Sequence, residues 1–108
     1  MIAVTTCQKP MYLTYQTRVL ELGMLGEEPI LEAKVLVEVD SDDPIHVVRA
    51  SRLANACLYH IYLLDQKFKI ESEVVHQGKE YPFSEDHYPQ YSDESGRAWI
   101  LSTVDRRG

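Results

Sequence analysis

Two segments near the start of the chain have the residue pattern typical of β-strands. The segment YLTYQTRVLEL, residues 12–22, is rich in β-branched and aromatic side chains, and ILEAKVLVEVD, residues 30–40, follows it. In the second segment one face of the predicted strand is apolar and consists of Leu31, Ala33, Val35, Val37 and Val39. Between them, GMLGEEP contains two glycines and a proline, so we expect an antiparallel hairpin with a long connection.

The first of these strands does not keep a single apolar face. Leu13, Tyr15 and Val19 fall on one side, whereas Leu20 and Leu22 fall on the other. A β-bulge near Val19 explains the switch, and so does a strand end that is covered on both sides. The pattern leaves both explanations open.

Residues 44–64, PIHVVRASRLANACLYHIYLL, predict a helix. Asp42 or Asp43 is placed to cap its first N–H groups, and Pro44 suits the first turn because its missing N–H has no partner there. One arc of the helical wheel has the spacing of a core-facing stripe. It consists of Val47, Ala50, Ala54, Cys57, Leu58, Ile61 and Leu64.

The opposite arc of this helix is not purely polar. It holds Val48, Arg49, Arg52, Asn55, Ala56, Tyr59, His60, Tyr62 and Leu63. Burying one Leu or Val side chain is worth about 1.5–3 kcal/mol, so an exposed apolar arc favours association. We therefore expect a second protein surface to cover this arc, and the tip of the long hairpin folding back over the helix is the intramolecular alternative.

Three strand signals follow the helix. Residues 67–75, KFKIESEVV, alternate cleanly; HQGKE predicts a tight turn into a short strand at residues 81–83; and RAWILSTV, residues 97–104, predicts a last strand. Consecutive Trp99, Ile100 and Leu101 indicate that this last strand is interior or covered on both faces. The element order is β-β-α-β-(β)-β, which predicts an α+β fold with a single helix packed on a four- or five-stranded antiparallel sheet.

Length and charge narrow the functional classes. The 108 residues suit a single domain, and the net charge of −6 disfavours direct binding of nucleic acid. The chain contains only two cysteines, no signal peptide pattern and no apolar run long enough to span a bilayer. We therefore expect a cytoplasmic protein with reduced thiols and no membrane partner.

Candidate chemistry begins with Cys57 and His60, which are three residues apart and so adjacent on a helix. A zinc site needs two further ligands, and the remaining Cys and His residues form no second pair, so we expect no metal and no cofactor. Nucleophilic catalysis by Cys57 or Cys7, with a histidine base and an acid such as Asp86, lacks a local sequence signature. The sequence therefore favours a binding protein over an enzyme.

Residues 84–96 alternate tyrosines with acidic side chains, a pattern that suits docking on a basic protein surface. The alternative is a solvated connector whose tyrosines cover the edge of the core. A calcium loop is excluded because the glycine and ligand positions of an EF-hand are absent.

In size, acidic charge and lack of a catalytic motif, the chain resembles the small interaction proteins of phages and mobile elements, such as anti-CRISPR and toxin-immunity proteins. The resemblance implies an inhibitor that occupies the surface of a partner protein, which can itself be a nucleic-acid-binding protein. The residues expected to bind it are Arg49, Arg52, Asn55, Tyr59, Tyr62, Glu85, Asp86, Tyr88, Tyr91, Asp93 and Glu94. The alternatives are a small enzyme or ligand-binding protein that uses the helix arginines and a histidine, and a homodimeric structural subunit.

Overall fold

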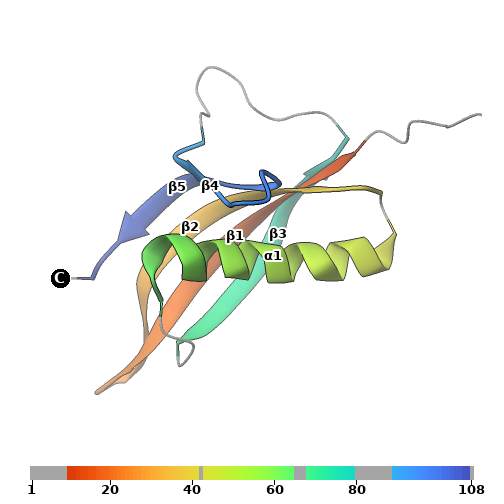
Figure 1. The fold of residues 1–108 in the computed structure, drawn as a ribbon. Helices are drawn as coiled ribbons and strands as arrows, with labels where there is room; N and C mark the ends of the chain where they lie inside the picture. The colour runs from red at the N-terminus through yellow and green to blue at the C-terminus, as the bar shows by residue number, and fades with distance from the viewer. Residues whose placement is uncertain (1–9, 42, 65–67, 80–88, 108) are drawn as a thin grey trace, which may run out of the picture.

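The computed structural model describes residues 10–41, 43–64, 68–79 and 89–107. Within these residues one helix packs on a five-stranded antiparallel sheet whose strand order is β3-β1-β2-β5-β4 (Figure 1), which confirms the predicted α+β class. The elements are β1 (Met11–Gly23), β2 (Gly26–Val39), α1 (Pro44–Tyr62), β3 (Lys69–Gly78), β4 (Tyr91–Ser92) and β5 (Ala98–Asp105).

The core lies between α1 and one face of the sheet. The predicted apolar face of β2 is buried along its whole length, and it meets Leu13, Tyr15 and Val19 of β1. From the helix, Ala50 and Ala54 are buried, and their small side chains let the helix backbone approach β2 closely. Alternation along β2 therefore decides which side chains form the core.

The opposite face of the sheet is also closed at its centre. Leu36 of β2 is fully buried there, although its side chain alternates with those of Val35 and Val37 and so lies on the face away from α1. Its cross-strand neighbours are Thr14, which is also buried, and Trp99, which is half-buried.

The β1–β2 connection differs from the predicted long loop. Met24 and Leu25 alone form the turn, and the strands pair as far as Gly23 and Gly26. Gly26 has a φ of 120°, a conformation that L side chains rarely adopt, so a glycine there permits the tight reversal. The bulge predicted in β1 near Val19 is wrong, because Val19 pairs with Leu31 and Leu20 with Pro29, which places the extra residue on β2 at Ile30. β1 keeps its alternation, and Val19 and Leu20 are both buried because the strand is covered on both faces there.

The helix begins as its sequence predicts and ends slightly earlier. Asp43 caps it, with its carboxylate Oδ1 accepting a hydrogen bond from the N–H of Ile45 at 3.0 Å, and Pro44 opens the first turn. The helix ends at Tyr62, and Leu63 follows in the left-handed conformation, with φ 52° and ψ 43°. The whole predicted core-facing arc is buried or packs against the core.

The later strands contradict one prediction and confirm another. The turn expected at HQGKE is wrong for its first three residues, because His76 to Gly78 continue β3, whose pairing with β1 includes a bulge at Val75. The last strand is interior at Trp99 and Ile100, as predicted, because both residues pair with β2 and with β4. A bulge follows, since Lys34 pairs with Ser102 and Val35 with Ile100, which leaves Leu101 without a partner on β2. The predicted strand at residues 81–83 lies outside the described residues.

Among the described residues, no helix is both long enough and apolar enough to cross a membrane.

Candidate functional site: the exposed face of the helix

The side of α1 that faces away from the sheet exposes a continuous row of side chains. We call this row the outer stripe, and it consists of Ile45, Val48, Arg49, Arg52, Ala56, His60 and Leu63, all of them exposed. Val48 is 56% exposed and Leu63 is 87% exposed. The hairpin tip does not cover the outer stripe, because Met24 and Leu25 are themselves almost completely exposed. The intramolecular alternative from the sequence is therefore wrong.

Tyr62 does not belong to this exposed face, so its predicted place on the outer arc is wrong. Its side chain is partly buried against the core cluster. The Tyr91 ring of β4 meets the Tyr62 ring edge-on at a centroid distance of 6.3 Å, and the Arg107 guanidinium lies 5.5 Å from the Tyr62 ring centroid. Tyr62 therefore joins the end of the helix to β4 and to the residues that follow β5.

Asn55 and Tyr59 connect the helix to β3. Asn55 Oδ1 accepts a hydrogen bond from Ser72 Oγ at 3.0 Å, and Ser72 Oγ lies 3.3 Å from Oγ1 of the fully buried Thr17. The Tyr59 hydroxyl donates to the carbonyl oxygen of Phe68 at 3.2 Å. Both predicted binding residues are thus half-buried and engaged in the fold.

Arg49 and Arg52 differ from the other arginines that the structure describes. Arg18, Arg97, Arg106 and Arg107 each form an ion pair with a carboxylate. Arg49 and Arg52 have no ion-pair partner within the described residues, and α1 itself contains no acidic residue. The outer stripe is therefore a cationic and apolar surface on a chain whose net charge is −6.

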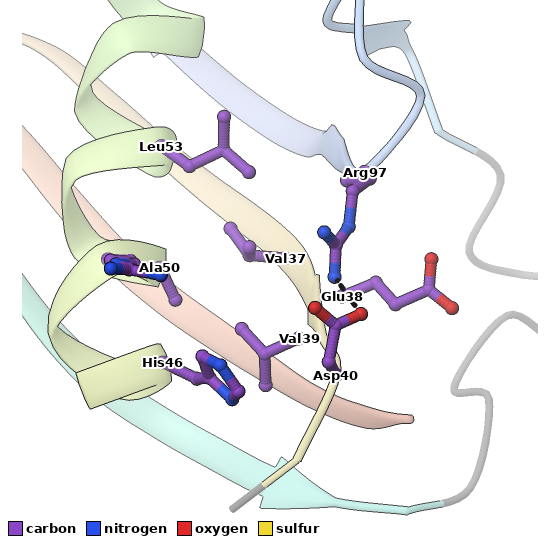
Figure 2. A pocket seen from close by; sticks show the side chains of 9 residues that line it. Val37, Glu38, Val39, Asp40, His46, Ala50, Leu53 and Arg97 are labelled. Atoms are coloured by element: carbon purple, nitrogen blue, oxygen red, sulfur yellow. Dashed lines mark hydrogen bonds and ion pairs between the residues drawn. The ribbon is translucent and has the colours of Figure 1, made fainter. Parts of the chain in front are cut away.

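A small hollow lies beside the first turns of the helix (Figure 2). Its volume is about 120 Å³, and its apolar part consists of Val37, Val39, Ala50 and Leu53. Arg97 and Asp40 point toward one another at its rim, where Arg97 Nη2 lies 2.8 Å from Asp40 Oδ1. Sites for metabolites and cofactors usually measure about 300–1,000 Å³, so this hollow is too small for such a ligand.

The structure brings Cys57 and His60 to one surface with acidic residues, as a nucleophilic site would require. They line a hollow of about 200 Å³ together with Asp93 and Glu94, and His60 Nε2 lies 3.4 Å from Glu94 Oε1. However, Cys57 is only 1% exposed, and burial, with the nearby negative charge of Asp93, raises the pKa of its thiol to about 11. A reactive cysteine requires the opposite shift, so this arrangement does not favour catalysis.

Of the predicted acidic and tyrosine-rich loop, Glu85, Asp86 and Tyr88 lie outside the described residues. Tyr91 is half exposed and packs on Tyr62. Asp93 organises the β4–β5 turn: its Oδ1 accepts from the N–H groups of Arg97 and Ala98, each at 3.1 Å. Burial acts to raise the pKa of Asp93, but hydrogen bonds from Ser95 Oγ and from backbone N–H groups outweigh it and hold the pKa below its usual value. Among the described acids of this loop, Glu94 is thus the more accessible one.

The sequence reasoning missed one exposed apolar surface, the tip of the β1–β2 hairpin. Leu22 is 82% exposed, and Met24 and Leu25 are almost completely exposed. The signal was the pair of glycines around Met24 and Leu25, which marks a two-residue turn with apolar residues where polar ones are usual.

No group of three or more His, Cys, Asp or Glu side chains suited to hold a metal ion occurs in the part of the chain that the structure describes. The chain matches no protein-family model, no curated protein and no solved structure among those compared with it.

Proposed function

We propose that this protein is a non-enzymatic protein-binding module and that its partner covers the outer stripe of α1. The observation that supports this most directly is the position of Leu63. Its backbone is left-handed, with φ 52° and ψ 43°, and its side chain is 87% exposed.

Leu63 stabilises the fold poorly at this position. The left-handed conformation costs a residue with a Cβ about 1–2 kcal/mol, and glycine is the usual residue there because it avoids this cost. An exposed leucine also forgoes the free energy of burial. A partner surface that buries the Leu63 side chain gives this residue a role that the fold alone does not.

The charge of the outer stripe indicates the character of the partner. Arg49 and Arg52 are exposed and lack ion-pair partners within the described residues, and Val48 and Ala56 add apolar area beside them. Such a surface complements one that combines apolar side chains with carboxylates, because the two guanidinium groups then gain charge-assisted hydrogen bonds. The narrower hypothesis of an inhibitor from a phage or mobile element stays a prediction.

A single substitution separates binding from stability. Leu63→Gly should raise the free energy of unfolding by about 0.5–1 kcal/mol, because it relieves the left-handed strain. The same change should weaken partner binding by roughly tenfold or more, because it removes a buried apolar contact. A variant that is more stable but binds the partner as tightly as the wild type would contradict the proposal.

The partner can be captured through a photo-crosslinking amino acid placed at Val48 in the native cell. Val104 of β5 provides the matched control, because it is 51% exposed against 56% for Val48 and lies on the sheet face away from α1. We expect a discrete cross-linked product from position 48, its loss in the Leu63→Gly background, and no such product from position 104. Equal cross-linking from both positions would contradict a specific site.

A further inference from the structure

The β1–β2 hairpin extends beyond the rest of the sheet as a two-stranded ribbon (Figure 1). Pairing of β1 with β3 ends at Leu20, and pairing of β2 with β5 begins at Leu31. Residues 21–28 therefore pair in the sheet only with one another, and Leu22, Met24 and Leu25 at the tip are exposed. Exposed apolar residues gathered at the end of a projecting ribbon form a surface suited to insert into a groove.

Two carboxylates face each other next to this apolar tip. Glu21 and Glu28 are direct cross-strand partners, so their side chains share one face of the ribbon. Like charges in this relation destabilise a hairpin, and no cation pairs with either glutamate within the described residues. Glu27 differs, because Lys69 Nζ lies 3.3 Å from its Oε2. The tip thus presents an uncompensated pair of negative charges.

The outer stripe presents the complementary pair. Arg49 and Arg52 are three residues apart on α1, which places their Cβ atoms about 5–6 Å apart. Directly opposed residues of a hairpin such as Glu21 and Glu28 have Cβ atoms about 4.5–5.5 Å apart. The two arginines and the two glutamates are therefore spaced to form two ion pairs at once.

The apolar parts of the two surfaces also match. An open groove lined by Ala56, Tyr59, His60 and Leu64 continues the outer stripe toward the end of the helix, and its volume is about 670 Å³. This groove lies beside Arg49 and Arg52, and the apolar hairpin tip lies beside Glu21 and Glu28. The two surfaces are therefore complementary in both shape and charge. The tip of the same chain does not reach it, since its apolar residues are exposed.

We propose that the occupant of the outer stripe is a second copy of this chain, whose hairpin tip lies along α1 with Glu21 and Glu28 paired to Arg49 and Arg52. This inference rests on the proposed function and names its partner. Every copy has one hairpin tip and one outer stripe. Two copies related by a two-fold axis can therefore form a closed dimer in which each tip lies on the stripe of the other copy. If the contacts do not close in this way, each tip binds the next copy and longer assemblies form.

A membrane is a poorer occupant for the tip. Cellular membrane surfaces are anionic and repel Glu21 and Glu28, and residues 21–28 contain no Lys, Arg, Trp or Tyr to anchor at the lipid interface.

Charge reversal tests the pairing directly. Sedimentation velocity over a concentration series should show concentration-dependent association of the wild type. The helix variant Arg49→Glu/Arg52→Glu and the tip variant Glu21→Arg/Glu28→Arg should each weaken association on the order of tenfold or more, since each places like charges together. The quadruple variant with all four changes should associate again, because the signs are exchanged on both sides. If these four residues only stabilised the fold, the quadruple variant would not regain association.

The matched control is Glu38→Arg/Glu73→Arg, which changes the net charge as much as the tip variant does but on the sheet face away from α1. It should associate like the wild type. Raising the salt to 1 M, where the screening length is about 3 Å, should weaken wild-type association. A wild-type protein that stays monomeric at every concentration, or a quadruple variant that does not recover, overturns the proposal.

The cross-linking product from position 48 distinguishes this inference from the proposed function. A product of about twice the 12.4 kDa of one chain supports self-association. A product with another protein, together with a monomeric wild type, overturns self-association but leaves the outer stripe as a binding surface. The absence of any product from position 48 contradicts both.

Discussion

The Tyr59 hydroxyl donates a hydrogen bond to the carbonyl oxygen of Phe68, 3.2 Å away, and so connects the last turns of α1 to the segment that enters β3. This contact changes the role of a residue that the helical wheel assigns to partner binding. The ring of Tyr59 still lines the open groove beside Ala56 and Leu64, while its hydroxyl serves the fold.

The first prediction follows from this division of roles. Tyr59→Phe keeps the ring and removes the hydroxyl, so it should lower the free energy of unfolding by about 0.5–1.5 kcal/mol. Binding at the outer stripe should change little, because the apolar ring remains. Urea denaturation and the association assay, performed on the same sample, check both parts. A large loss of binding without a loss of stability would show that the hydroxyl contacts the partner instead.

A second prediction concerns the buried hydroxyl of Thr17. Its Oγ1 lies 3.3 Å from Ser72 Oγ, which in turn donates to Asn55 Oδ1. Thr17→Val should therefore lower the free energy of unfolding by about 1 kcal/mol. Thr14→Val is the matched control, because Thr14 is also buried but forms no side-chain hydrogen bond within the described residues. Equal effects of the two substitutions would contradict a role for the hydrogen bonds.

The pKa of Asp93 predicts how stability depends on pH. Burial acts to raise this pKa, but hydrogen bonds from Ser95, Ala98 and Arg97 hold it below the usual 3.8. The stability that Asp93 provides is therefore present above pH 3.8 and is lost as the pH falls through its lower folded-state value. Asp93→Asn should cost about 1 kcal/mol at pH 7 and nothing in acid below that value. Thermal unfolding from pH 2 to pH 7 measures this, and parallel curves for the two proteins would refute it.

Cys57 should be nearly inert in the native protein. Burial and the charge of Asp93 raise the pKa of its thiol to about 11, so at pH 8 only about one molecule in a thousand holds a thiolate. In a Cys7→Ser background, a thiol reagent at pH 8 should label Cys57 far more slowly than it labels the unfolded chain. Rapid labelling of the folded protein would reopen the case for a nucleophile.

Because the pKa of the Cys57 thiol is raised, the stability linked to Cys57 is complete below pH 9, the usual pKa of a cysteine thiol, and declines as the pH rises toward 11.

Local patterns in the sequence were sufficient for several elements. The alternation in β2 identifies its buried face, because successive side chains of a strand point to opposite sides whatever the strand contacts. Asp43 and Pro44 define the start of the helix, since capping involves only neighbouring residues. The change of apolar face in β1 was less informative, because it left open a bulge and a strand covered on both sides, and the extra residue lies on β2 at Ile30.

The candidate site depended on contacts that a sequence does not specify. Tyr62 lies on the border of the apolar arc, and only the presence of Tyr91 and Arg107 beside it decides that its ring turns inward. That Arg49 and Arg52 have no ion-pair partner in the part of the chain that the structure describes likewise depends on which acidic residues the fold brings near them.

The sequence by itself determined the α+β class, the buried face of β2 and the helix cap, since these follow from periodicities and contacts between neighbouring residues. The tertiary structure alone decided the strand order, the projecting hairpin tip and the composition of the outer stripe. The physical reason is that exposure and charge pairing are properties of residues brought together from distant parts of the chain, and pattern along the chain does not specify those neighbours.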